Sequence, residues 1–263
     1  ESQKTILHIF NSKFYLDNKK VENLPIGLFG DFYSHELSFI LINSNDEKNL
    51  KNIFHKCNLK VKKILIKSFL KSANISENFK NNETFFHIKI NKKNSKIFYF
   101  ENNSLKFEQN FEFGTDIIIN DISKLTSLKT DTVKLILDEI ELKNDISENE
   151  LIKTELFVND AFRKIKKKLI YNIAEARIKE IIELMLSKNI NFSHFNKDFN
   201  DVFFEINPKT QLKTLEETFK SIFSMYRNYD LIIIDTLTSE SLINTANKLV
   251  HFGWKNEAIP ISQ

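Results

Sequence analysis

The segment from Phe85 to Phe100, FFHIKINKKNSKIFYF, reads as two strands joined by a lysine-rich turn. Lysine ammonium groups beside such a turn could attract a phosphate without a metal. A solvated hairpin tip is the plainer interpretation of a turn rich in Lys and Asn. A glycine-rich phosphate loop is nearly excluded, because the four glycines of the chain are too far apart to form a G-x-G-x-x-G turn or a P-loop.

The run RKIKKK, Arg163 to Lys168, is the most concentrated basic segment. If it is helical, Arg163, Lys166 and Lys167 share a face, because residues three or four apart are neighbours on a helix. A solvated helix face is the plain interpretation, and an acidic peptide or anionic lipid surface is the sharper one. RNA is a weaker third option, since no aromatic residues are interleaved with the lysines.

Residues for metal binding or covalent catalysis are not grouped in the sequence. The six histidines are dispersed, with no H-x-x-x-H pair and no cysteine at ligand spacing, so no metal site is expected. Asp116, Asp121 and Asp235 lie near expected strand ends, where capping of turns and helices explains them better than acid–base chemistry. No nucleophile-elbow motif occurs, and we therefore assign no catalytic residue.

The composition is that of a globular protein. The chain has 263 residues, 41% of them hydrophobic, which suffices for a substantial core. The formal charge is +3, from 38 Lys and Arg against 35 Asp and Glu with the signs interspersed, so no nucleic-acid partner is expected. No apolar run reaches the roughly 18 residues of a membrane span, and we expect a cytoplasmic protein.

Hydrophobic patterns at the front of the chain predict a small α+β unit. Its predicted elements are strands at 5–10, 36–43 and 61–66 and a helix at 46–57. On that helix Cys57 shares a stripe with Leu50, Ile53 and Phe54, which predicts a buried, inert thiol.

The remainder of the chain predicts alternating helices and strands, typical of an α/β fold. One helix is predicted to run to Leu142 with Thr130 or Asp131 as its N-cap, and another to follow a capping box at Ser147 and Glu150. The other predicted helices are at 68–75, 159–187, 212–223 and 239–252. The predicted strands are the hairpin at 85–100 and runs at 105–112, 202–206 and 230–235.

Three segments resemble consecutive parts of the bacterial cell-division family FtsA, which has an actin-like fold. They are ILHIFNSKFYLDNKKVENLPIGLFGDFYSHELSFILIN, NLKNIFHKCNLKVKKILIKSFLKSANI and FEFGTDIIINDISKLT. The first carries a turn, Pro25 to Gly27, similar to the proline-x-glycine turn of the family's insert subdomain. The third carries Gly114, Thr115 and Asp116 where the family has glycine-glycine-aspartate before a helix. The resemblance continues weakly to LVHFGW.

The resemblance implies an α/β, actin-like (ribonuclease-H-like) fold with a small α+β insert subdomain. It divides the chain into four parts: an insert subdomain at 1–62, a return to the first core lobe at 63–84, a second core lobe with a closing helix at 85–130 and 198–263, and a helical partner-binding subdomain at 131–197.

The family's second phosphate loop is an aspartate, an isoleucine, three glycines, two threonines and an aspartate, and it falls on residues 89–96. The positions that lose the acids and glycines are Lys89, Asn91, Lys92, Lys93 and Lys96. Glycines let backbone N–H groups approach phosphate, and a carboxylate holds the hydrated Mg²⁺ that a lysine would repel. We therefore expect the family's cofactors, ATP and Mg²⁺, to be lost. Two other nucleotide segments, at Val133 and Lys134 and at 205–209, also lack the family's residues.

The segment IAEARIKEIIEL, 173–184, resembles the family helix that receives the tail peptide of the polymer protein FtsZ, and Arg177 matches an arginine of that helix. A guanidinium can grip a carboxylate through two parallel hydrogen bonds. Arg163, Lys166 and Lys179 would raise the local positive potential. The plain alternative is that Arg177 only pairs with Glu180 or Glu183.

The resemblance thus implies a non-enzymatic division adaptor, peripheral to the inner face of the membrane at the division site. Its expected partners are the FtsZ C-terminal tail, other copies of itself, and later division proteins through the insert, with membrane contact only through a C-terminal helix of the family that this sequence lacks. The alternative is a nucleotide-switched actin-fold ATPase, such as the pilus-assembly type.

Overall fold

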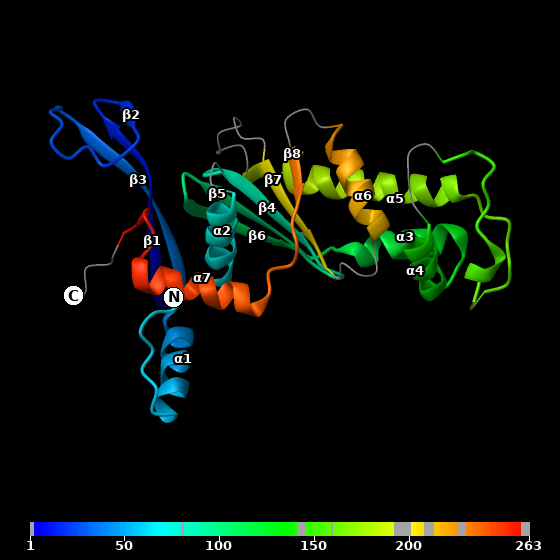
Figure 1. Ribbon diagram of the computed structural model, residues 1–263, viewed down its shortest axis with the longest axis horizontal. Coiled ribbons are helices and arrows are strands. Elements are labelled where there is room, and N and C mark those ends of the chain that lie inside the picture. Colours follow the sequence, from blue (N-terminus) through cyan, green and yellow to red (C-terminus); the bar gives the residue numbers. More distant parts are fainter. Residues whose placement is uncertain are drawn as a thin grey trace. The chain divides into compact units, whose positions relative to one another are not determined.

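The computed structural model describes residues 3–79, 82–140, 146–158, 160–191, 201–207, 213–225 and 230–258 (Figure 1). The chain forms two compact units. Unit 1 comprises Glu1–Phe85, Phe98–Glu108 and Leu237–Gln263, and unit 2 comprises Phe86–Ile97 and Gln109–Thr236. The four-part division expected from the resemblance is finer than this and stays a prediction.

Unit 1 contains a sheet of order β2-β1-β3, with β9 also paired to β1. Its strands are β1 (Lys4–Leu16), β2 (Lys19–Val21), β3 (Tyr33–Asn43) and β9 (Glu257–Ala258). Asp17 and Asn18 join β1 to β2 with φ values of 50° and 63°, as the tightest hairpin turns require. The strands at 5–10 and 36–43 are thus confirmed, although both are longer than predicted.

The core of unit 1 lies on one face of this sheet. His8 and Phe10 of β1 are buried, and the Phe10 ring lies 4.8 Å from that of Phe69. Phe69 belongs to α2 (Lys67–Asn78), which packs on α7 (Ser239–Phe252), where Asn74 Nδ2 donates to Thr245 Oγ1 at 2.9 Å. Both helices agree with the sequence patterns.

The end of the described chain closes this core through a buried hydrogen bond. His8 Nδ1 lies 2.7 Å from Glu257 Oε1, and Lys63 Nζ lies 2.8 Å from Glu257 Oε2. Burial raises the pKa of Glu257, but the bonds from His8 and Lys63 outweigh it and hold that pKa below its ordinary value. Residues from three distant parts of the sequence therefore meet at one carboxylate.

Helix α1 (Ser44–Lys56) follows β3 and forms as predicted, with Asn43 Oδ1 accepting from the backbone N–H of Asn45 at its start. Its apolar stripe is not buried. Cys57 is exposed, so the prediction of a buried thiol is wrong. The strand predicted at 61–66 does not form either: those residues make no ladder, and the N–H of Ile66 donates to His8 Nε2 at 3.4 Å.

The second sheet has five strands in the order β6-β5-β4-β7-β8. They are β4 (Phe85–Ile90), β5 (Ser95–Glu101), β6 (Ser104–Phe111), β7 (Asp201–Ile206) and β8 (Asp230–Ile233). β4 runs parallel to β7, and β7 runs parallel to β8. Helices separate the parallel strands along the chain, so the predicted α/β class is confirmed.

The helices of unit 2 are α3 (Thr115–Thr126), α4 (Thr130–Glu139), α5 (Lys167–Ile182), which continues as a π-helical turn at Glu183–Ser187, and α6 (Lys213–Phe223). Of these helices, α6 agrees with the sequence pattern, whereas α5 starts later than predicted. The helix predicted from residue 159 begins only at Lys167. Within 146–158 only the short η1 (Thr154–Leu156) forms, so the helix predicted after Ser147 is absent there.

The late start of α5 has a non-local cause. Leu151 forms a β-bridge with Lys166, and the N–H of Ile152 donates to the carbonyl of Ile165 at 2.9 Å. This pairing holds Lys166 in extended geometry, with φ −78° and ψ 136°.

Across the described residues, no helix is long and apolar enough to cross a bilayer.

Candidate functional site

The turn between β4 and β5 is a packed structure. The backbone N–H of Asn91 donates to the carbonyl of Asn94 at 2.9 Å, and their side chains bond each other at 2.7 Å. The hydroxyl of buried Ser95 donates to the carbonyl of Phe113 at 2.7 Å. Lys92 and Lys93 are exposed. The lysine-rich tip is thus solvated, as expected, while hydrogen bonds within the turn and to Phe113 fix the backbone beneath it.

The backbone of this turn packs against the N-terminus of α3. The first N–H groups of a helix have no partner within it and are a ready site for phosphate. Here the N–H of Thr115 donates to the carbonyl of Asn91 at 3.0 Å, and that of Asp116 donates to the carbonyl of Lys92 at 2.9 Å. Carbonyls of the turn therefore take the donors that a phosphate would need.

Gly114 makes this close approach possible. A Cβ atom at this position would lie 2.1 Å from the carbonyl oxygen of Asn91 and 2.5 Å from that of Lys92. Real Cβ atoms never come so near a backbone oxygen, so only glycine allows the turn and the helix to meet. The resemblance placed Gly114 before a helix, and this helix is present.

Lys89 lies near the carboxyl end of β4, where the family's loop begins with an aspartate. It stands in register with Glu205 of β7, and its Nζ lies 2.5 Å from Glu205 Oε1. The Glu205 side chain is 0% exposed and that of Lys89 is 16% exposed. The Glu205 carboxylate, near the carboxyl ends of these two inner strands, is therefore already paired with the ammonium group of Lys89.

His87 completes the cluster. Its side chain is fully buried. It lies on the same face of β4 as Lys89, because alternate residues of a strand share a face. His87 Nε2 lies 3.4 Å from Glu205 Oε2. This arrangement resembles a closed internal ion pair more than an open metal site. Among the described residues, no group of three or more His, Cys, Asp or Glu side chains could hold a metal ion.

The proposed peptide-binding arginine, Arg177 of α5, is engaged within the molecule. Its Nε lies 2.5 Å from Asp121 Oδ2 of α3, and its Nη1 donates to Glu180. Lys179 pairs with Glu175 at 3.0 Å. Arg177 therefore ties α5 to α3, and Asp121, interpreted from the sequence as a capping residue, is its partner.

The other basic residues expected near Arg177 do not share a helix face with one another. Arg163 and Lys166 precede α5, so the prediction of one face with Lys167 is wrong, because the bridge described above keeps this stretch extended. Arg163 Nη1 donates to the carbonyl of Thr126 at 3.3 Å, and Lys167 pairs with Glu150.

A capping residue was also missed. The N-cap residue of α4 is Lys129, whereas the sequence offered Thr130 or Asp131 as the cap. Asp160 Oδ2 accepts from the backbone N–H of Lys129 at 3.0 Å and from Thr132 Oγ1 at 2.6 Å. The bonds from Thr132 and Lys129 lower the pKa of Asp160. A cap supplied from thirty residues away leaves no local pattern.

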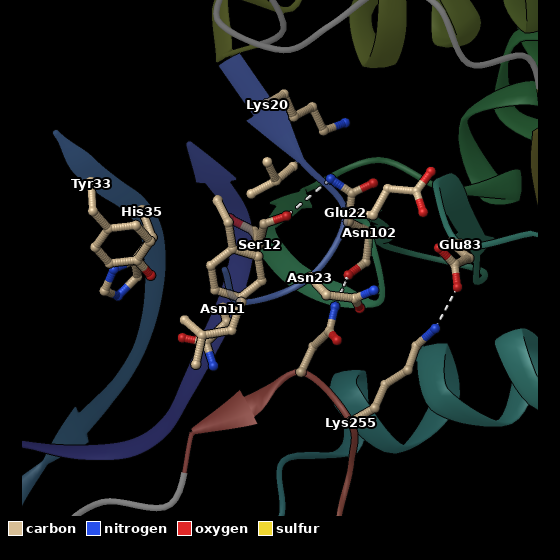
Figure 2. Close-up of a pocket in the computed structure, with 14 residues that line it drawn as sticks. Asn11, Ser12, Lys20, Glu22, Asn23, Tyr33, His35, Glu83, Asn102 and Lys255 are labelled. Carbon is tan, nitrogen blue, oxygen red and sulfur yellow. Dashed lines mark hydrogen bonds and ion pairs between the residues drawn. The ribbon is translucent and has the colours of Figure 1, made fainter. Parts of the chain in front are cut away.

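Unit 1 contains a polar cavity of about 930 Å³ that the sequence did not indicate (Figure 2). Figure 2 shows Tyr33 and His35 together on one wall, and their rings lie 5.5 Å apart. Elsewhere its groups bond one another: Asn102 Nδ2 donates to the carbonyl of Ser12 at 3.0 Å, and Lys255 pairs with Glu83. The cavity offers hydrogen bonds to a polar molecule but no catalytic constellation.

No protein-family model matches the sequence, and no curated protein matches it. Among solved structures, the chain is similar to the PilM–PilN type IV pilus biogenesis complex, with 7% identity and a TM-score of 0.48 over 92% of this chain and 63% of that one. It is also similar to MreB5 of Spiroplasma citri bound to ADP, with 11% identity and a TM-score of 0.47 over 79% of this chain and 65% of that one. This chain thus spans less than two thirds of either.

These neighbours are proteins of the actin-like ATPase fold, the fold class that the resemblance implies. Each of the two likenesses has a TM-score below 0.5 and an identity below 25%, so neither tells anything of ligand, activity or partner. What the structure itself shows is an α/β chain, and its place in a family is a matter for proposal.

Proposed function

We propose that this chain is a nucleotide-independent actin-like scaffold. The observation that carries the proposal is the phosphate-loop region itself: Lys89 neutralises the buried Glu205, and the turn carbonyls occupy the first N–H donors of α3. A nucleotide would have to displace both interactions and bring a cation beside an ammonium group, which is unfavourable.

Calorimetry with Mg²⁺ and ATP tests the proposal, and we expect no heat of binding and no phosphate release. MreB5 of Spiroplasma citri, which was solved bound to ADP, is a suitable positive control. Because the chain spans less than two thirds of its first structural neighbours, a longer form of the gene product should be titrated as well. Micromolar, Mg²⁺-dependent affinity in either form would support the alternative, a nucleotide-switched actin-fold ATPase of the pilus-assembly type.

We further propose that the scaffold acts as a division adaptor of the FtsA type, at the inner face of the membrane, with the acidic tail of FtsZ bound along α5. The support is the resemblance of residues 173–184 and the position of Arg177, whose side chain is 27% exposed. Asp121 and Glu180 engage two of its three nitrogens, so a tail carboxylate would bind at Nη2 or displace Glu180.

Charge reversal tests the arginine. Arg177→Glu should weaken binding of an FtsZ tail peptide by about 2 kcal/mol or more, roughly thirty-fold, measured by fluorescence anisotropy. This variant also sets three carboxylates together and could loosen α5 from α3. The matched control is the swap Asp121→Lys with Arg177→Glu, which restores the ion pair in reverse. A swapped protein that binds the peptide as tightly as the parent would exclude the arginine site.

A further inference from the structure

Helix α1 exposes a continuous apolar stripe. Leu50, Ile53 and Phe54 are 37%, 61% and 41% exposed, and exposed Cys57 follows at the helix end. These residues are spaced i, i+3, i+4 and i+7, so they lie on one face. Leu59, just beyond the helix, is 57% exposed. An amphipathic helix of a globular protein normally buries such a face, whereas these side chains are exposed.

The same segment is strongly basic. From residue 48 to residue 63 the chain has six lysines and neither Asp nor Glu. Lys51 pairs with Glu47 at 2.6 Å and Lys63 pairs with Glu257 at 2.8 Å. The remaining four are exposed and, among the described residues, have no carboxylate within ion-pair distance: Lys48, Lys56, Lys60 and Lys62.

The lysines lie on both sides of the stripe. At 100° per residue, Lys51 and Lys56 project about 110° to either side of the stripe's centre. Cations on both flanks suit a flat anionic surface, because both can reach it while the apolar face enters the boundary between headgroups and acyl chains. An apolar groove of a protein would also accept the stripe, and the dimer test below separates that occupant from a bilayer.

We propose that α1 and the segment 57–63 form a docking surface for an anionic lipid bilayer. The stripe supplies the apolar contact, and Lys56, Lys60 and Lys62 supply the charge complementarity, since Lys48 lies on the opposite face of α1. This site is distinct from the family's C-terminal membrane helix and from RKIKKK, the segment for which the sequence suggested lipid adsorption. The proposed division role does not depend on it.

Flotation of the whole chain with vesicles tests the proposal. We expect binding to phosphatidylcholine vesicles containing about one third phosphatidylglycerol, and much weaker binding to pure phosphatidylcholine. Lys56→Gln with Lys60→Gln should weaken binding about twenty-five-fold, since each lysine near an anionic surface contributes about 1 kcal/mol, a factor of about five. The matched control is Lys164→Gln with Lys166→Gln, in RKIKKK, which should leave binding unchanged.

The apolar half of the surface has its own test. Ile53→Asn with Phe54→Asn should reduce binding at least ten-fold without affecting folding, because both side chains are already exposed. Phe29→Asn is the control: Phe29 is fully exposed on another loop of unit 1 and should not matter. Equal losses from the two variants would show general stickiness and overturn the proposal.

Cys57 provides a direct readout of insertion, because it is the single cysteine of the chain and is exposed. An environment-sensitive fluorophore attached there should shift to the blue on vesicle binding and become protected from an aqueous quencher. A vesicle-bound protein whose label stays fully quenchable would contradict the proposal. So would stripe variants that dissociate a dimer, seen by light scattering, while leaving vesicle binding intact, because the stripe would then be a protein interface.

Discussion

Replacing Glu205 with Ala should lower the free energy of unfolding by about 3–5 kcal/mol, which is the usual effect of breaking a buried ion pair from one side. The variant leaves the Lys89 ammonium without its partner at 2.5 Å, in a place where that side chain is only 16% exposed. It also removes the carboxylate beside the buried His87. Equilibrium denaturation in guanidinium chloride, followed by circular dichroism, measures the change.

A double variant separates the charge from the packing. Lys89→Met with Glu205→Leu removes both charges and keeps comparable volume, and it should be nearly as stable as the parent, because an apolar pair often replaces a buried ion pair at little cost. If Glu205→Ala cost less than about 1 kcal/mol, the cluster would be open to water and the closed phosphate site would lose its main support.

Replacing Gly114 with Ala should destabilise the protein by about 2–3 kcal/mol, the upper part of the range for overpacking. The cause is steric, because the new Cβ would stand 2.1 Å from the Asn91 carbonyl oxygen, which belongs to backbone and cannot rotate away. The turn and α3 must separate, so the amide protons of Thr115 and Asp116 should exchange with solvent markedly faster than in the parent.

Gly27 is the matched control for this substitution. Nothing lies within 4 Å of the position of its Cβ, and its φ of 81° is the only obstacle to a side chain. Gly27→Ala should therefore cost about 1 kcal/mol through backbone strain and leave the exchange of Thr115 and Asp116 unchanged. Similar losses from both variants would mean that the packed turn is unimportant for stability.

The α/β class and the hairpin around residues 91–94 could be predicted because both depend on local patterns. Alternating and continuous apolar runs mark the strands, and the Lys/Asn turn marks the bend between them. The start of α5 could not be predicted, because a bridge between Leu151 and Lys166 overrides a helical pattern that begins earlier. The residue that caps α4 could not be predicted for the same reason, because Asp160 is distant from the helix start in sequence.

Helix α1 illustrates a different limit. The spacing of Leu50, Ile53, Phe54 and Cys57 shows that they share a face, and it says nothing of what covers that face. The sequence interpretation assumed a core, whereas the structure leaves the stripe exposed.

For the candidate site at residues 89–96, the sequence predicted the loss of the phosphate-binding residues but not the contacts that replace them. The missing acids and glycines of residues 89–96 are readable in the sequence, while the partner of Lys89 lies 116 residues further on. One signal was available: Glu205 stands alone in VFFEI, an otherwise apolar strand, and a charged residue in a buried strand needs an opposite charge beside it.

Because His8 bonds Glu257, the core of unit 1 can be completed only after almost the whole chain has been synthesised. Unit 1 begins with the first strand of the chain, yet its core is closed by α7 and β9, which are translated only after the whole of unit 2. At roughly 5–20 residues per second, β1 waits on the order of ten seconds or more for its last partner. During that interval Phe69 has no Trp254 beside it, so nascent chains should depend on holding chaperones until the C-terminal helix emerges.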